Sequence, residues 1–347
     1  MKKTLISIIW AIVVLALAVS CATKAAAPEP EKAPATAETK AETPAPAPAP
    51  EKTPEPAKEE AVILEVNGAK TGFATLEEAF AAVPAGSEAT VTICSDIAVK
   101  KAIPVKEAPV TLTDNGKAVT VADEVNDGDG IQYVFMVEGA GRLTVSPKAG
   151  ITFLAADPAK FSVTRVMFLV GTGYKEPEQM SGYLELNPGI TVTGVKSTSF
   201  GGIVRGYGEV VINGGTYTSS ANNKGNGLFT FYSKAAINDG VFSGNESVTV
   251  GMIMVTVECE LVINGGTFEN NSGATSGLMK VNSKATCTIN GGTFRNNKAF
   301  NDGAGAIDAT GTVTINGGVF ADNAYADVVV AEKGVFTKAE SVTVNVK

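Results

Sequence analysis

The 347-residue sequence has no histidine, one tryptophan and four cysteines, and its few arginines are Arg142, Arg165, Arg205 and Arg295. Histidine is the commonest general base and the commonest transition-metal ligand, so its absence argues against Ser-His-Asp hydrolysis and against zinc chemistry. The net charge of -8 argues against a nucleic-acid partner. We accordingly expect no cofactor.

What the sequence has instead is an internal repeat. The segment Ile-Asn-Gly-Gly-Thr-Phe, or a close variant, recurs with its isoleucine at Ile212, Ile237, Ile263, Ile289 and Ile315. These isoleucines recur with a period of about 26 residues, which is typical of stacked-repeat architectures. Each unit alternates apolar and polar residues over short stretches and contains no helical stretch. We therefore predict an all-β fold, a right-handed parallel β-helix with about 26 residues and three strands per coil.

The repeated residues have structural duties in such a coil. The isoleucines should point inward, together with Phe242, Phe268, Phe294 and Phe320. The turn asparagines should tolerate left-handed backbone geometry and stack as an amide ladder; they are Asn213, Asn238, Asn264, Asn290 and Asn316. Cys259 and Cys287 fall on inward positions of neighbouring coils but two residues out of register, so we predict buried free thiols.

The same register extends toward the N-terminus. Earlier coils are predicted to open at residues 91–93, 110–112, 143–145 and 184–186, with residues 171–181 as an inserted loop. N-terminal to these coils, the capping-box spacing of Thr75 to Glu78 predicts the start of a short amphipathic helix. Residues 62–66 are predicted to form a strand. We assign residues 61–90 to this strand and capping helix, and residues 91–347 to the parallel β-helix.

Over roughly residues 62–347, this pattern resembles the pectin-lyase-like right-handed β-helix superfamily. The Phe242 to Asn245 spacing, repeated in three later units, and the Gly-Ala-Ile at 305–307 are also similar to the FxxN and GGAI repeats of chlamydial polymorphic outer-membrane proteins. In an earlier unit, Tyr217 is followed by Ser220 where the others have asparagine. The resemblance implies the fold. The motifs of polygalacturonases (Asn-Thr-Asp, Asp-Asp, Gly-His-Gly) are missing, and no arginine lies in a pectate-lyase motif, so we expect no enzyme of those kinds.

The N-terminus predicts an anchored protein. Lys2 and Lys3 precede an apolar run that ends in Ala18-Val19-Ser20-Cys21, which resembles a bacterial lipoprotein signal with Cys21 as the lipidated residue. The competing interpretation is an ordinary cleavage site beside an incidental cysteine. We predict a lipoprotein signal peptide at 1–20 and a lipid that binds the membrane. Residue 22 is alanine, which by resemblance favours anchoring in the outer membrane of the cell envelope, facing the surface or the periplasm.

Residues 21–60 join this anchor to the predicted fold. They are almost entirely Ala, Pro, Glu, Lys and Thr, a composition that cannot bury a core. We predict that they form an extended, disordered tether.

Two sets of acidic residues are candidates for a functional site, one for glycoside hydrolysis and one for calcium binding. Two carboxylates suffice for glycoside hydrolysis, and Asp302, Asp308, Asp322 and Asp327 fall within two successive coils; the simpler interpretation is loop acids that keep the surface soluble. Asp123, Asp127 and Asp129 offer oxygen ligands in a glycine-rich segment, a weak calcium candidate whose spacing fits no EF-hand. An exposed turn without metal is the favoured interpretation there, because Asp, Asn and Gly are ordinary turn formers.

Surface residues that depart from the repeat are the candidates for ligand contact. Tyr174 and Tyr183, in and after the inserted loop, have the chemistry to stack against a sugar, although a loop with incidental tyrosines is the simpler interpretation. Thr230, Met254, Lys280 and Asp308 should line one outward face. We therefore expect a surface-anchored, non-enzymatic lipoprotein acting as an adhesion, interaction or structural envelope module for glycan or protein. The alternative is an envelope polysaccharide lyase or glycoside hydrolase that uses carboxylates.

Overall fold

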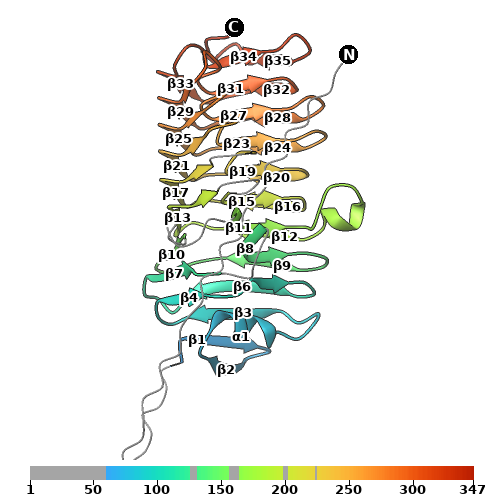
Figure 1. Ribbon diagram of the computed structural model, residues 1–347, viewed down its shortest axis with the longest axis vertical. Coiled ribbons are helices and arrows are strands. Elements are labelled where there is room, and N and C mark those ends of the chain that lie inside the picture. Colours follow the sequence, from blue (N-terminus) through green and yellow to red (C-terminus); the bar gives the residue numbers. More distant parts are fainter. Residues whose placement is uncertain (1–59, 126–130, 156–163, 198–201, 223–224) are drawn as a thin grey trace, which may run out of the picture. The chain divides into compact units, whose positions relative to one another are not determined.

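The computed structural model describes residues 60–125, 131–155, 164–197, 202–222 and 225–347. The chain in these ranges folds into a right-handed parallel β-helix, in which successive coils stack and each strand pairs with its counterparts in the coils above and below (Figure 1). The predicted fold is confirmed. Stacking coils in this way satisfies the backbone hydrogen bonds of every inner strand and buries one face of each sheet.

Three long sheets form the walls of the β-helix. Sheet A contains, in chain order, β1 (Val62–Val66), β2 (Ala69–Phe73), β3 (Ala89–Ile93), β6 (Pro109–Asp114), β9 (Arg142–Val145), β12 (Tyr183–Leu186), β16 (Glu209–Ile212), β20 (Lys234–Ile237), β24 (Glu260–Ile263), β28 (Thr286–Ile289), β32 (Thr312–Ile315) and β35 (Val335–Lys338). Sheet B contains β4 (Ile97–Val99), β7 (Val119–Asp123), β10 (Ile151–Leu154), β13 (Ile190–Thr193), β17 (Thr216–Thr218), β21 (Val241–Ser243), β25 (Thr267–Glu269), β29 (Thr293–Arg295) and β33 (Val319–Ala321). Sheet C contains β5 (Ile103–Val105), β8 (Ile131–Val137), β11 (Thr164–Val170), β15 (Val204–Gly206), β19 (Phe229–Phe231), β23 (Ile253–Val255), β27 (Met279–Val281), β31 (Ile307–Ala309) and β34 (Val328–Val330).

A fourth, narrow sheet corrects the expectation of three strands per coil. Sheet D is built from two-residue strands: β14 (Lys196–Ser197), β18 (Ala221–Asn222), β22 (Glu246–Ser247), β26 (Ser272–Gly273) and β30 (Lys298–Ala299). Strands this short carry too few alternating side chains to show a period in the sequence. The coils that contain sheet D therefore have four strands.

Coil length differs between the two halves of the β-helix. Along sheet A, the later register partners are evenly spaced in the sequence, so these coils keep the period of the isoleucine repeat; the partners are Leu184, Val210, Ala235, Leu261, Cys287 and Val313. Upstream, Ala89 pairs with Val110, Val110 with Leu143 and Leu143 with Leu184. The first of these coils is shorter than the repeat and the next two are longer. The predicted period therefore holds for the later coils only.

A column of aromatic rings fills the later coils. Tyr217 stacks on Phe242 with ring centroids 4.8 Å apart, and the column continues through Phe268 and Phe294 to Phe320 at separations of 4.6 to 5.0 Å. Phe242, Phe268 and Phe294 are fully buried and Phe320 is partly buried. The prediction that these phenylalanines point inward is confirmed.

Two asparagine ladders run along the later coils. The predicted outer ladder is present: each side-chain Nδ2 donates to the Oδ1 of the preceding coil, from Asn316 back to Asn187, at 2.7 to 2.9 Å. A second ladder lies inside and comprises Asn245, Asn271, Asn297 and Asn323. Each of its amides also donates to the backbone carbonyl of an aromatic residue, as Asn271 does to Phe242 at 2.9 Å. The FxxN spacing therefore encodes a buried polar ladder, whose side-chain oxygens also accept from N–H groups of the turn, as Asn271 Oδ1 does from the Asn245 N–H at 3.1 Å.

The turn geometry corrects one detail of the prediction. The left-handed residue of each Ile-Asn-Gly-Gly turn is the second glycine, as at Gly266 with φ +101°, and not the asparagine. The nearest atom that a Cβ on Gly266 would meet is the Gly240 carbonyl oxygen of the preceding coil, 3.1 Å away. The asparagine instead uses its amide in the outer ladder.

The N-terminal end is covered as predicted. Helix α1 (Leu76–Ala81) begins at Thr75, whose Oγ1 accepts a hydrogen bond from the Glu78 N–H at 3.2 Å, and it buries Leu76, Ala79 and Phe80. Strands β1 and β2 form an antiparallel hairpin, and β1 pairs with β3, the first strand of the parallel stack. Hairpin and helix together cover the strand edges and core side chains of the first coil.

Candidate functional site

The outward row of sheet C contains the four residues predicted to line one face. Thr230, Met254, Lys280 and Asp308 are consecutive register partners. The Lys280 Nζ lies 3.1 Å from Asp308 Oδ2, so the two charges neutralise each other. Thr230 is only 2% exposed, and its hydroxyl donates to the Gly227 carbonyl at 3.1 Å. Three of the four residues therefore offer surface, and Thr230 does not.

Upstream, the same row leads into a cluster of tyrosines. Thr230 pairs with Arg205, and Arg205 with Leu169. Tyr207 and Tyr232, one residue beyond strands β15 and β19, lie with ring centroids 4.6 Å apart, and Tyr207 packs in one small hydrophobic cluster with Val166 and Leu169. This cluster lies outside the main core, on the outer face of sheet C.

The inserted loop adds Tyr174 to this cluster. The Tyr174 ring lies 5.1 Å from that of Tyr232, at an interplanar angle of 14°, and 6.1 Å from that of Tyr207, at 24°. The Tyr174 side chain is 56% exposed, whereas Tyr207 is 7% exposed. We call Tyr174, Tyr207 and Tyr232 the tyrosine stack. The Arg205 guanidinium carbon lies 5.2 Å from the centre of the Tyr207 ring, and burial raises the pKa of Tyr207.

Internal hydrogen bonds fix the loop that carries Tyr174. It contains the short 3-10 helix η1 (Pro177–Met180) and projects beyond the coils between β11 and β12 (Figure 1). The Thr172 N–H donates to the Gln179 carbonyl at 2.9 Å, and Gln179 Oε1 accepts from the N–H groups of Lys175 and Glu176 at 3.3 Å. Gly171 has φ +78°, and a Cβ there would lie 2.4 Å from the Gln179 carbonyl oxygen. The loop therefore has one defined shape that only glycine at 171 permits.

Tyr183 does not join the tyrosine stack. It lies on the outer face of sheet A, where the Arg142 guanidinium carbon is 3.7 Å from its ring centre and its hydroxyl donates to Glu185 at 3.0 Å. Burial, followed by the Glu185 hydrogen bond, raises the pKa of Tyr183. A tyrosine with a raised pKa holds its proton at neutral pH and is poorly suited to act as a general base. The two tyrosines proposed from the sequence thus face different sides of the β-helix.

The acidic residues considered for glycoside hydrolysis have local roles. Asp302 and Asp322 occupy left-handed turn positions, with φ of +39° and +55°. Asp327 is buried and accepts hydrogen bonds from the Asn323 amide and the Asn345 N–H, both at 2.8 Å, so it terminates the inner ladder. Asp308 is paired with Lys280. Each of the four acids has a turn, ladder or ion-pair role that does not require catalysis.

Part of the weak calcium candidate can be located. Asp123 is 5% exposed and its Oδ1 accepts from the Val125 N–H at 3.1 Å, whereas Asp127 and Asp129 lie outside the described residues, as does Cys21. Among the residues that the structure describes, no three His, Cys, Asp or Glu side chains gather as a metal site would require.

The two thiols that were predicted to be buried, those of Cys259 and Cys287, are free. Cys259 and Cys287 are buried and unbridged, as predicted, and burial raises the pKa of both, that of Cys259 to about 12. A thiol with such a pKa is almost wholly protonated at neutral pH and is a poor nucleophile.

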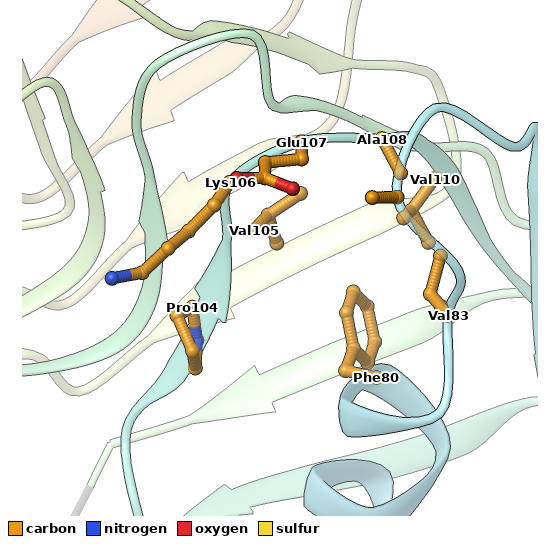
Figure 2. Close-up of a pocket in the computed structure, with 9 residues that line it drawn as sticks. Phe80, Val83, Pro104, Val105, Lys106, Glu107, Ala108 and Val110 are labelled. Carbon is orange, nitrogen blue, oxygen red and sulfur yellow. The ribbon is translucent and has the colours of Figure 1, made fainter.

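An apolar hollow of about 240 Å³ lies beside the capping helix. Figure 2 shows the Phe80 ring directed into it and the Lys106 side chain directed away. Lys106 Nζ pairs with Glu138 at 2.9 Å. The remaining lining is Val83, Ala85, Pro104, Val105, Glu107, Ala108 and Val110. The hollow is a gap between the cap and the first coils.

The sequence interpretation missed Tyr207, Tyr232 and Arg205 as members of a site. A signal was available: Tyr207 and Tyr232 have the same spacing in the sequence as Ile212 and Ile237, so they occupy one position in successive coils. Their contact with Tyr174 had no such signal, because the loop lies outside the repeat.

No helix within the described ranges is long and apolar enough to span a membrane. No family model, curated protein or solved structure matches the chain.

Proposed function

We propose that the protein is a non-enzymatic interaction module of the pectin-lyase-like superfamily, held on a bacterial cell envelope by a lipid on Cys21. Its contact surface is the outer face of sheet C around the inserted loop, and its partner is a glycan or a protein. The observation that carries the proposal is the tyrosine stack. A half-exposed aromatic ring that stands on a fixed loop and is supported by two rings from the coils is typical of binding surfaces and adds nothing to the main core.

The structural roles of the repeat residues and of the candidate carboxylates also favour a binding function. In the later coils, the isoleucines and phenylalanines lie in the core and the asparagines form the two ladders. The candidate carboxylates are bound into turns and ion pairs, and the sequence has no histidine to supply a base. Surface binding therefore has more support than hydrolysis or lyase chemistry.

The full-length protein, purified in detergent, should be incubated with uronic-acid and neutral polysaccharides while new reducing ends and unsaturated products are measured. We expect no product. Reproducible cleavage that is lost in Asp308→Asn would overturn the proposal in favour of the enzymatic alternative.

Two further experiments test binding and anchoring. Immobilised protein should bind at least one glycan or envelope protein, and mass spectrometry of the mature N-terminus should find Cys21 acylated.

A further inference from the structure

We infer that the exposed ring of Tyr174 is a carbohydrate-stacking platform, which takes one internal pyranose of a neutral, β-linked, gluco-configured glycan. The inference rests on the proposed function, because it names the ligand class of that binding surface.

The geometry supports the Tyr174 ring and still leaves much of it exposed. Tyr232 and Tyr207 lie nearly parallel to Tyr174, at 5.1 and 6.1 Å, yet 56% of Tyr174 stays exposed. The supporting rings are themselves held, since Tyr207 is nearly buried and the Tyr232 hydroxyl accepts from the Asn226 amide at 3.0 Å. A ring fixed in this way loses little rotational freedom on binding, which favours the bound state.

The size of the platform favours a sugar over a protein. A stable protein interface buries about 800 Å² on each partner, whereas a single aromatic side chain buries about 150 to 250 Å². One ring therefore matches one pyranose. In a β-linked gluco-configured pyranose all substituents are equatorial, so its faces present axial C–H bonds whose positive hydrogens meet the negative face of the aromatic ring.

The surroundings of Tyr174 favour a neutral chain. Lys175, Glu176 and Glu178 are exposed on the same loop, so the loop carries both signs of charge and offers polar groups to equatorial hydroxyls. The Tyr174 side chain is 56% exposed, so the ring lies at the surface and not in an enclosed pocket, which suits an internal residue of a chain better than a chain end. A single platform gives weak binding, with a dissociation constant on the order of 1 mM, and many copies on one envelope would raise the avidity.

The test is a titration of the full-length protein with cellopentaose and chitopentaose, with α-linked maltopentaose as the mismatched glycan. Tyr174→Ala should weaken binding of the β-linked glycans by about tenfold or more, a loss of about 1.4 kcal/mol. Tyr174→Phe keeps the ring and should retain binding. Tyr325→Ala is the matched control, because Tyr325 is 51% exposed but lies against Lys347, away from the loop. Unchanged melting temperatures would show that all variants fold.

Three outcomes would overturn the inference: equal affinity in Tyr174→Ala, equal affinity for maltopentaose, or no glycan binding by the unaltered protein. If the protein then captures a purified envelope protein, the proposed function stands without this ligand class. If it cleaves the oligosaccharides, the proposed function fails instead.

Discussion

The later coils, residues 183–321, and the earlier coils, residues 89–182, are packed in different ways. In the later coils the length is nearly constant, and similar side chains meet in columns. In the earlier coils the length varies, since the sequence separation of register partners grows from Ala89 and Val110 to Leu143 and Leu184. A ladder needs constant coil length, whereas a sheet needs only register.

This difference separates scaffold from binding surface. Lengthening a surface loop costs little free energy, because closure entropy grows slowly with length. The earlier coils can therefore carry the Tyr174 loop while sheets A, B and C continue through them. The later coils have no such freedom without breaking the aromatic column and both ladders.

The largest effect should come from breaking the aromatic column. Phe268→Ala removes a fully buried ring that stacks on Phe242 and Phe294, and should lower the free energy of unfolding by about 3 to 5 kcal/mol. Val241→Ala, at a 39% exposed position of the same sheet, should change it by less than about 1 kcal/mol. Chemical denaturation followed by circular dichroism measures both. Equal losses would contradict the assignment of the column as core.

The next effect distinguishes the two ladders. Asn271→Ala removes the buried acceptor of the Asn245 N–H and the amide donor to the Phe242 carbonyl, and should cost about 2 to 4 kcal/mol. Asn264→Ala in the exposed outer ladder should cost about 1 kcal/mol or less, because water replaces the lost partners. If the denaturation midpoints fall equally in the two variants, burial does not determine how much a ladder contributes to the free energy of unfolding.

In the earlier coils, the pH dependence of the free energy of unfolding should reveal the contribution of Asp114. Burial alone would raise the pKa of Asp114, but hydrogen bonds from the N–H groups of Ala149, Gly116, Gly150 and Lys148 hold it below its usual value. Stability from this group is therefore present above the unfolded pKa of about 3.9 and is lost as pH falls through the folded pKa.

The matching variant is Asp114→Asn, which should lose about 1 to 3 kcal/mol at pH 7 and less below pH 3, because the protonated native carboxyl has lost the same advantage. Unfolding curves between pH 2 and 7 check this. A deficit that stays constant across that range would show that charge is not the cause.

A smaller stability effect than at Phe268, Asn271 or Asp114 is expected at the tyrosine stack. Tyr174→Ala removes ring contacts outside the main core, and should lower the free energy of unfolding by about 0.5 to 1.5 kcal/mol. Thermal unfolding would reveal it as a small shift. A loss as large as that of Phe268→Ala would mean that the stack is a structural element.

The sequence predicted the parts of the fold that repeat. The inward positions of Ile263 and Phe268 and the place of Asn264 in the outer ladder were predicted correctly, because regular repetition fixes both register and facing. The two-residue strands of sheet D and the inward direction of Asn271 were missed. Short strands have no measurable period, and an asparagine has the same sequence signature whether its turn points in or out.

The site was only partly predictable, for a related reason. Tyr174 was identified as a candidate, but its partners come from two later coils and from a loop whose path depends on local bonds such as Thr172 to Gln179. Tyr183 was grouped with Tyr174 by nearness in sequence, although the corner between sheets C and A sends the two rings to different faces.

The most direct measurement compares the affinity for cellopentaose of three full-length proteins. The first is unaltered, the second has loop residues 173–180 replaced by two glycines, and the third lacks residues 264–289, one whole coil between register partners Ile263 and Ile289. Because each coil contacts only its neighbours, removing one should leave the fold and the affinity intact. We expect binding to be lost with the loop and kept without the coil. Binding that survives loop replacement, or disappears with the coil while the protein stays folded, would contradict it.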